Sequence, residues 1–267
     1  MSRRFDGRVV MVTGSTGMAA SAARALTSEG ASVFVTSRTP ANAETLGAEL
    51  GGGWMAADLA REEDADAAVR ACIERHGRLD ALYAVAGISG RRIGDGPLHE
   101  MSLAGWQTVM TNNATSLFLV TRAAIQRMLA QEAGADGSRG VLLAMSSALA
   151  RHPSPVHFAT HAYAASKGAI ESFTRAVAAA YAPQGIRMNA IAPSLVATPM
   201  SERAQSDPAI VAYLRQKQPL AGGPIHADAI TPVALHLLSG DARMITGQVI
   251  EVDAGWSVSE PEPPRPA

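Results

Sequence analysis

Short apolar runs alternate along the chain with longer segments in which apolar residues recur every three or four positions. The apolar runs predict β-strands at residues 8–13, 32–36, 54–57, 81–86, 141–145, 187–191 and 248–252. The periodic segments predict helices at residues 18–29, 41–50, 62–76, 103–132, 162–182 and 227–238. Strands that alternate with helices in this way are typical of an α/β protein.

Most predicted strands are apolar at nearly every position, as in Val9-Val10-Met11-Val12, which indicates a parallel sheet buried on both faces. With right-handed crossovers, this order of elements predicts a doubly wound parallel sheet between two layers of helices, the three-layer αβα Rossmann fold. We expect one such domain over residues 1–258. The polar segment 199–224 predicts an irregular, mobile lid, and the proline-rich segment 259–267 predicts a disordered tail.

Composition narrows the class of protein. With 267 residues, 47% of them hydrophobic, the chain can bury a substantial core. The net charge of −1 argues against a nucleic-acid partner, because such proteins carry an excess of Lys and Arg. The lone cysteine, Cys72, excludes an internal disulfide and a thiolate metal cluster. No apolar run approaches the length of a membrane span, and the N-terminus lacks a signal-peptide core, so we expect a cytoplasmic protein with no membrane partner.

The turn after the first predicted strand is rich in small residues, Thr13-Gly14-Ser15-Thr16-Gly17-Met18. Ligands of open parallel sheets bind at the carboxyl ends of the strands. Small residues there let a pyrophosphate approach the backbone amides and the N-terminus of the next helix. The turn therefore predicts a dinucleotide site, although an ordinary glycine-rich turn has a similar sequence.

The second predicted strand is followed by Ser37 and Arg38, where an NAD-type site would place Asp or Glu to bind the ribose 2′-hydroxyl. A guanidinium binds phosphate oxygens in pairs and suits a 2′-phosphate. We therefore expect NADP(H) rather than NAD(H). A solvated surface arginine, and with it an NAD(H) enzyme, remains the alternative.

Tyr163 and Lys167 are four residues apart in a predicted helix, so their side chains lie on one face. A nearby ammonium favours the phenolate and lowers the pKa of a tyrosine, which is ordinarily near 10. A tyrosine with a lowered pKa can exchange a proton with an alcohol or carbonyl oxygen. Taken alone, the pair equally fits an amphipathic helix with a half-buried Tyr and a surface Lys.

The glycine turn, Ser146-Ser147 after a strand and Tyr163 with Lys167 downstream together resemble the short-chain dehydrogenase/reductase family in its short, single-domain form, from about residue 8 to 255. The resemblance implies an oxidoreductase that interconverts a carbonyl and a secondary alcohol by hydride transfer with NADP(H). It also implies a small-molecule substrate and a homo-oligomer, either a tetramer or a dimer.

The resemblance gives four residues catalytic roles. Tyr163 is implied as the general acid or base, and Lys167 as the group that binds the nicotinamide ribose and lowers the pKa of Tyr163. Ser147 is implied to hold the substrate oxygen. Asn113 is implied to position a water in a proton relay, whereas the adjacent Asn112 would point about 100° away around the helix.

The resemblance also marks binding residues. The implied cofactor contacts are Gly14, Ser15, Thr16, Gly17, Met18, Ser37, Arg38, Asp58, Leu59, Ala86, Gly87, Tyr163, Lys167, Pro193, Val196 and Thr198. The implied substrate contacts are Ser147, Leu149, Phe158 and Ser194, in a largely apolar pocket that we expect to include Ile88, Ser89, Val156 and Leu195.

Some positions depart from the family pattern. The turn is one residue shorter than usual, with the spacing Gly14-x-x-Gly17-x-x-Ala20. Ala84 and Val85 replace an asparagine pair whose amides tie neighbouring strands together, so we expect some loss of local stability. His157 and His161 could bind a metal if they were helical, but the prolines before them favour a loop that lines the substrate pocket. We expect no metal.

Other readings of the same fold are a dinucleotide-binding regulator with little turnover and a non-redox lyase. Lyases of this kind resemble the family but lack its nucleotide turn and its lysine. The presence of Gly14, Gly17 and Lys167 therefore disfavours the lyase. Enoyl reductases of the family have a wider Tyr–Lys spacing. The three residues between Tyr163 and Lys167 therefore favour C=O chemistry over C=C chemistry.

Overall fold

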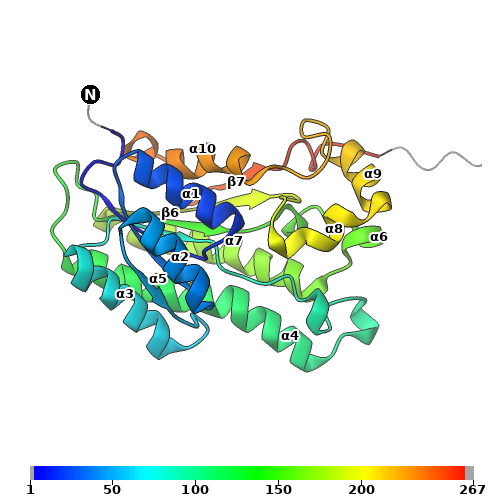
Figure 1. Ribbon diagram of the computed structural model, residues 1–267, viewed down its shortest axis with the longest axis horizontal. Coiled ribbons are helices and arrows are strands. Elements are labelled where there is room, and N and C mark those ends of the chain that lie inside the picture. The colour runs from blue at the N-terminus through cyan, green and yellow to red at the C-terminus, as the bar shows by residue number, and fades with distance from the viewer. Residues whose placement is uncertain (1–2, 262–267) are drawn as a thin grey trace, which may run out of the picture.

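The computed structural model describes residues 3–261 and contains a seven-stranded parallel sheet with the strand order β3-β2-β1-β4-β5-β6-β7 (Figure 1). The strands are β1 (Val9–Thr13), β2 (Ser32–Ser37), β3 (Trp54–Ala56), β4 (Ala81–Ala84), β5 (Gly140–Met145), β6 (Ile186–Pro193) and β7 (Val249–Val252). The order reverses direction between β1 and β4, as in a doubly wound sheet, and confirms the predicted Rossmann fold. Residues 262–267 of the predicted tail lie outside the described residues.

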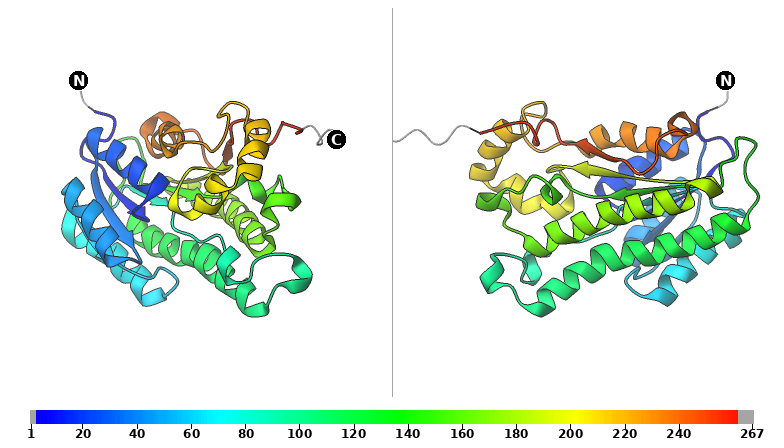
Figure 2. Two further views of the ribbon diagram at one scale, coloured as in Figure 1. Left: turned by 45° about the vertical axis from the view of Figure 1, so that its right-hand side comes forward. Right: turned by 180° about the vertical axis from the view of Figure 1, so that it is seen from behind.

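Helices cover both faces of the sheet, and the two further views show the same layers (Figure 2). One face carries α1 (Gly17–Ser28), α2 (Pro40–Leu50) and α10 (Ala227–Leu238), and the other carries α3 (Glu62–His76), α5 (Ser116–Ala130) and α7 (His161–Tyr181). The predicted bounds of α3 and α10 are those observed. In the described part of the chain, no helix is both long enough and apolar enough to cross a membrane.

The core consists of two apolar layers, one on each side of the sheet. Small residues let α1 lie close to α10, because Ala19, Ala22 and Ala23 are buried on the inner face of α1. On the opposite side, Cys72 is fully buried in α3, and burial raises the pKa of its thiol to about 12. The positions that were apolar throughout in the sequence are buried throughout in β1, β4 and β5.

The single long helix predicted at 103–132 is interrupted. The structure has α4 (Leu103–Met110), a π-helical turn over Thr111–Thr115, and then α5. A π-turn inserts an extra residue into the helical hydrogen-bond pattern and often marks a functional site. Here Asn113 sits within that turn and is 1% exposed.

The segment 199–224, predicted to be irregular, contains helices, and that prediction was wrong. After a 3-10 turn at Pro199–Ser201 come α8 (Glu202–Ser206) and α9 (Pro208–Lys217). Proline suits the first turn of a helix, where its missing N–H is not needed, and Pro208 occupies such a position in α9. Asp207 caps α9 by accepting hydrogen bonds from the N–H groups of Ala209 and Ile210.

The loop between β5 and α7 holds another short helix, α6 (Pro155–Phe158), which also begins with a proline. Figure 1 shows α6, α8 and α9 together at one end of the molecule, beyond the strands. These helices form a cap over the carboxyl ends of β5 and β6. The mobility of this cap stays a prediction.

Candidate active site

The predicted site residues gather at the carboxyl ends of β1, β2, β4, β5 and β6, around two adjoining pockets. We call them the Tyr163 pocket and the Arg38 pocket, after a residue in each wall. Gly87 and Ile88 line both. The predicted residues on the Arg38 pocket are Gly14, Ser37, Arg38, Asp58, Leu59, Ala86 and Gly87. Those on the Tyr163 pocket that were expected to bind cofactor are Met18, Gly87, Tyr163, Lys167, Pro193, Val196 and Thr198.

The turn between β1 and α1 requires its glycines. Gly14 and Gly17 have φ angles of 99° and 52°, in the left-handed region that favours glycine. A Cβ atom on Gly17 would lie 2.7 Å from Cγ2 of Thr198, so the turn passes very close to the segment after β6. The N-cap residue Thr16 makes no side-chain hydrogen bond to the helix, which leaves the first N–H groups of α1 without a side-chain cap.

Ser15, Thr16 and Gly17 lie in this turn without lining either pocket. Ser15 contacts the next strand, because its hydroxyl donates a hydrogen bond to Ser37 Oγ at 2.9 Å. This bond fixes the end of β2 relative to the turn.

Arg38 is an exposed side chain on the wall of the Arg38 pocket. Its Nη1 donates a hydrogen bond to Asn112 Oδ1 at 3.0 Å, a neutral partner. A guanidinium held by one neutral acceptor keeps most of its N–H groups and its full charge available to an anion.

Ala84 and Val85 stand where the family pattern has an asparagine pair, but β1 and the end of β4 are still joined by hydrogen bonds. The Thr13 hydroxyl of β1 accepts hydrogen bonds from the N–H groups of Val85 and Ala86, each at 3.0 Å. Thr13 is 1% exposed, so these bonds form in the interior. A side chain of β1 therefore joins β1 to the end of β4. These two hydrogen bonds replace the ones whose absence was expected to lower the local stability.

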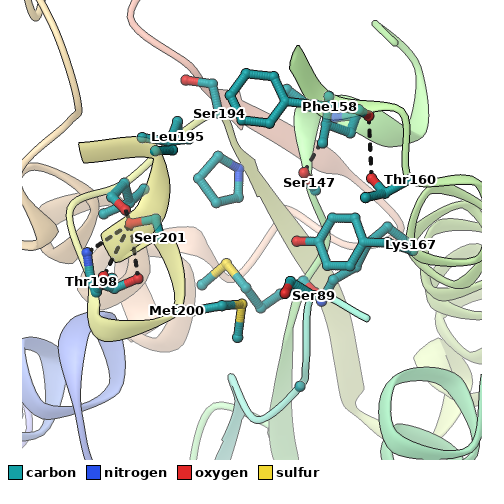
Figure 3. Close-up of a pocket in the computed structure, with 18 of the residues that line it drawn as sticks. Ser89, Ser147, Phe158, Thr160, Lys167, Ser194, Leu195, Thr198, Met200 and Ser201 are labelled. Carbon is teal, nitrogen blue, oxygen red and sulfur yellow. Dashed lines mark hydrogen bonds between the residues drawn. The ribbon is translucent and has the colours of Figure 1, made fainter. Parts of the chain in front are cut away.

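Ser147, Tyr163 and Lys167 line the same pocket. Ser147 follows β5, while Tyr163 lies in the first turn of α7 and Lys167 one turn later. Figure 3 shows Ser147 and Lys167 on one side of the pocket, with Thr198, Met200 and Ser201 facing them from the other side. The helical spacing predicted from sequence therefore does bring the two α7 side chains to one wall.

The pKa of Tyr163 differs from the prediction. Burial raises the pKa of Tyr163, and the Ser147 side chain only partly opposes that rise. The ammonium of Lys167 lies 5.6 Å from the centroid of the Tyr163 ring and donates a hydrogen bond to the carbonyl of Met145 at 2.7 Å. Burial lowers the pKa of Lys167 to about 8. The expected lowering of the Tyr163 pKa is therefore wrong, because burial, which raises this pKa, has the largest effect.

Asn113 lies behind the pocket wall and does not line the Tyr163 pocket. Its Oδ1 accepts a hydrogen bond from the N–H of Ile88 at 2.7 Å, and its Nδ2 donates to the Ile88 carbonyl and to Ser166 Oγ, each at 3.0 Å. Both amide hydrogens are used, and one lone pair of Oδ1 remains. Asn113 thus holds the segment after β4 against α7.

Two buried carboxylates that sequence reasoning missed position α7. Asp95, 2% exposed, accepts hydrogen bonds from the N–H groups of Ala162 and Tyr163 at 3.0 and 2.7 Å, and so caps α7 from a distant loop. Glu171, 4% exposed, accepts from Arg151 Nε at 2.6 Å and from Ser146 Oγ at 3.1 Å. No local spacing marks either residue, because each acts across the fold.

The substrate residues predicted at Ser147, Leu149, Phe158 and Ser194 all line the Tyr163 pocket, as do Ile88, Ser89 and Leu195. Val156 does not, and that prediction was wrong: it is 84% exposed on the outer side of the short α6 helix. The Ser194 hydroxyl donates a hydrogen bond to the carbonyl of Asp253 at 2.9 Å, which fixes the segment after β6.

An aromatic cluster closes the far side of this pocket. The Trp256 ring, 2% exposed, makes edge contacts with Phe158 and Tyr213 at centroid distances of 5.8 and 5.9 Å. Its Nε1 donates to the carbonyl of His152 at 3.1 Å. Trp256 was not predicted, and its only sequence signal is a large aromatic residue just after the last strand. It joins α6, α9 and the chain's C-terminal segment.

The two histidines considered for a metal have other partners. The His157 ring lies 4.8 Å from that of Tyr213, and His161 Nδ1 is 2.8 Å from the carbonyl oxygen of Gly96. Within residues 3–261, the structure shows no group of three or more His, Cys, Asp or Glu side chains placed to hold a metal ion.

Comparisons with known proteins find relatives named as dehydrogenases and reductases. A family model described as enoyl-(acyl carrier protein) reductase matches residues 12–257. Momilactone A synthase from Oryza sativa subsp. japonica is 34% identical, over 96% of this chain and 92% of that protein. Galactitol 2-dehydrogenase (L-tagatose-forming) from Cereibacter sphaeroides is 33% identical, over 96% and 97%.

Among solved structures, 3-ketoacyl-(acyl-carrier-protein) reductase from Brucella melitensis complexed with NADH has a TM-score of 0.84 at 30% identity, over 95% of this chain and 99% of that one. The similarity in sequence and fold therefore extends over nearly the whole chain.

Proposed function

Because the chain belongs to the short-chain dehydrogenase/reductase family, an oxidoreductase family that acts on CH–OH and C=O groups and binds NAD(P), we propose that it uses NADP(H) to interconvert a carbonyl compound and a secondary alcohol. The observation that carries the proposal is the meeting of Ser147, Tyr163 and Lys167 in one largely apolar pocket. Small-molecule carbonyl compounds of apolar character fit that pocket.

The described residues fit a nicotinamide dinucleotide. The glycine turn leaves uncapped N–H groups at the start of α1, where a pyrophosphate can bind. The only carboxylate in the wall of the Arg38 pocket is that of Asp58, which follows β3. The pocket has no Asp or Glu at the end of β2. Ser37 and Arg38 there offer a hydroxyl and a cation, which supports the phosphorylated cofactor over NAD(H).

We assign the proton transfer to Tyr163. Its raised pKa keeps the phenol protonated at neutral pH, so that it can donate a proton to the oxygen of a substrate carbonyl. Ser147 would donate a hydrogen bond to the same oxygen and stabilise the charge that develops on it. When bound, the reduced nicotinamide supplies the hydride that reaches the carbonyl carbon.

Lys167 and Asn113 act around the tyrosine. The Lys167 ammonium over the Tyr163 ring stabilises the phenolate that remains after proton donation, and we assign to it the nicotinamide ribose as well. A water that donates to the remaining Oδ1 lone pair of Asn113 would extend a proton relay from this site. Asn113 also holds Ile88, which lines both pockets, and so fixes the junction between them.

Parallel calorimetric titrations with NADPH and NADH test the cofactor assignment. We expect NADPH to bind about tenfold to hundredfold more tightly, the size of one or two charge-assisted hydrogen bonds. Tighter NADH binding would overturn the NADP(H) assignment and leave the oxidoreductase. Binding of a cofactor without turnover of any ketone in a screen would favour the dinucleotide-binding regulator instead.

We also infer a homo-oligomer that associates through the outer faces of α4 and α5. Leu103, Phe118 and Leu129 are large apolar residues there, 70%, 42% and 40% exposed. Phe118 makes an edge contact with Phe173 of α7, so the apolar surface continues onto the neighbouring helix. Light scattering after size-exclusion chromatography should give a dimer or tetramer mass, and a monomer mass would contradict this inference.

A further inference from the structure

Two arginines from distant segments meet at the rim of the Tyr163 pocket. Arg91 begins a 3-10 turn after β4, and Arg203 lies in α8. Both line the pocket together with Ser147 and Tyr163. Both also reach one acceptor, because Arg91 Nη2 donates to the carbonyl oxygen of His157 at 2.7 Å and Arg203 Nη2 to the same oxygen at 3.4 Å.

This pair has no carboxylate partner. Within residues 3–261, neither Arg91 nor Arg203 forms an ion pair. Ten other arginines of the described residues have a carboxylate oxygen within 4.0 Å: Arg3, Arg4, Arg8, Arg24, Arg61, Arg70, Arg78, Arg122, Arg151 and Arg175. In the walls of the Tyr163 and Arg38 pockets, the remaining arginine is Arg38, which also has only a neutral partner and which we have assigned to a phosphate.

The surroundings do not neutralise the two guanidinium groups. No Asp or Glu lines the Tyr163 pocket. Asp95 is the carboxylate that acts on Arg91, but it is buried, and its two oxygens accept the N–H groups of Ala162 and Tyr163. Burial and the charge of Arg203 both lower the pKa of Arg91, so the two cations repel each other. Two cations that face one neutral oxygen have unused N–H groups, and an anion would relieve their repulsion.

The rest of the pocket indicates what carries that anion. Besides the two arginines, Ser147 and Tyr163, the lining of the pocket includes Leu149, Phe158, Leu195 and Trp256, all apolar. A ligand that fills this pocket would have one end at the proposed proton donor, an apolar body, and a charged end at the arginines.

We propose that Arg91 and Arg203 form a subsite for an anionic oxygen group, a carboxylate or a phosphate, of a substrate whose carbonyl lies at Ser147 and Tyr163. This substrate class rests on the proposed function, because that function places the reacting carbonyl. It separates this protein from dehydrogenases of neutral polyols, such as the galactitol 2-dehydrogenase with which it shares 33% identity.

Kinetics with matched substrates test the subsite. The probes are straight-chain oxo acids of increasing length from levulinate upward, each beside its methyl ester, and phosphate monoesters of the corresponding hydroxyketones. We expect kcat/KM at the best length to be about tenfold to hundredfold higher for an anion than for its ester, mostly through KM, since charge-assisted hydrogen bonds have that effect. The better of the two anion classes identifies the group.

Variants at the two arginines provide the second arm. Arg91→Ala and Arg203→Ala should each reduce kcat/KM for the anion about tenfold and leave the ester within about threefold. Arg92→Ala is the matched control, because Arg92 is the exposed neighbour of Arg91 and does not line the pocket. Esters that react as well as acids, with no effect of either substitution, would overturn the proposal.

A binding measurement separates this proposal from the proposed function. Hexanoate, decanoate and their methyl esters have no reducible carbonyl, so their calorimetric titration in the presence of NADPH does not depend on turnover. Carboxylate binding that is lost in Arg91→Ala and Arg203→Ala supports the subsite even if no ketone is reduced. Equal binding of acids and esters would refute the subsite even if ketones are reduced.

Discussion

The Arg38 pocket and the aromatic side of the Tyr163 pocket differ in the kinds of residue that form them. The first is lined mostly by small residues from an early stretch of the chain: Gly14 follows β1, Ser37 ends β2 and Ala86 follows β4. The second consists of large rings, where Phe158 and Tyr213 meet Trp256 from segments about 40 to 100 residues away in the sequence. The early strands fix the first surface, whereas the second exists only when α6, α9 and the C-terminal segment have docked.

This difference shows how one fold can keep a constant binding surface and vary another. A turn that must pass within van der Waals contact of Thr198 tolerates few residues at Gly17. An aromatic cluster depends on total volume and contact, and such cores accept other combinations of residues. We therefore expect changes on the two sides to act separately on cofactor and substrate. The predictions below test that separation, from the largest expected effect to the smallest.

Tyr163→Phe acts where the two sides meet. Loss of the phenolic oxygen removes the proton donor, and we expect kcat to fall by about 10²–10⁴-fold. The dissociation constant of NADPH, measured by calorimetry, should stay within about twofold. Tyr213→Phe is the matched control, because it removes a phenol from α9 that bonds to Ser154 outside the chemistry. Turnover within tenfold of the wild type would remove Tyr163 from its role as donor.

Trp256→Ala should damage the substrate side alone. Truncation of a buried tryptophan typically costs about 3–5 kcal/mol in free energy of unfolding, because it leaves a cavity. Urea unfolding should show that loss, the KM for ketones should rise, and the affinity for NADPH should change little. Trp54→Ala on β3, where the side chain is 38% exposed, is the control and should cost much less. A comparable loss of NADPH affinity would mean that the two sides are coupled.

Lys167→Met tests the buried cation through the pH dependence of stability. Burial lowers the pKa of Lys167 from 10.5 to about 8, so between these values the unfolded chain binds more protons than the folded one. The free energy of unfolding of the wild type, minus that of the variant, should therefore rise from pH 8 to pH 10.5, by at most about 3 kcal/mol. The difference should be flat below pH 8. A falling difference in the same window would show that Lys167 is stabilised as a cation.

Arg38→Ala should damage the cofactor side alone. We expect NADPH to bind about tenfold to hundredfold more weakly, and NADH affinity and the KM for ketones to be nearly unchanged. Paired calorimetric titrations measure the ratio of the two affinities. Equal losses for the two cofactors would remove Arg38 as the group that reads the 2′-phosphate.

Asp95→Ala should have the smallest effect. It removes the acceptor for the Ala162 and Tyr163 amides, and loss of a helix cap costs about 1 kcal/mol. We expect that loss in thermal unfolding together with a lower kcat, since the cap sets the position of Tyr163. Asp95→Asn keeps a carbonyl oxygen and should restore part of both. A loss of stability with an unchanged kcat would make the cap structural only.

What could be predicted from the sequence follows the same division. The alternation of strands and helices, the glycine turn and the Tyr163–Lys167 pair depend on short-range patterns, and the structure has them. The prediction of an irregular segment at 199–224 was wrong, because Pro208 starts a helix there rather than interrupting one. The prediction that Val156 lines the pocket was wrong, because periodicity does not fix which side of a four-residue helix faces the pocket.

The remaining misses depend on distance in the sequence. Asp95 caps a helix that begins 66 residues later, and Arg203 reaches the same carbonyl as Arg91 from another segment. The pKa of Tyr163 was predicted from one neighbour, whereas burial by the whole pocket decides its direction. No local motif encodes these relations, because they form only in the folded chain.

Trp256 also gives the protein an intrinsic fluorescent probe of this pocket. Of the three tryptophans, Trp54 and Trp106 lie on the surface or partly exposed, whereas the Trp256 indole forms part of the pocket wall. Indole emission overlaps the absorption of reduced nicotinamide, and the two groups would share one cavity. A protein with Trp54 and Trp106 replaced by Phe would emit from Trp256 alone. Its light would then report cofactor arrival through energy transfer, and undocking of α9 through a shift toward longer wavelengths.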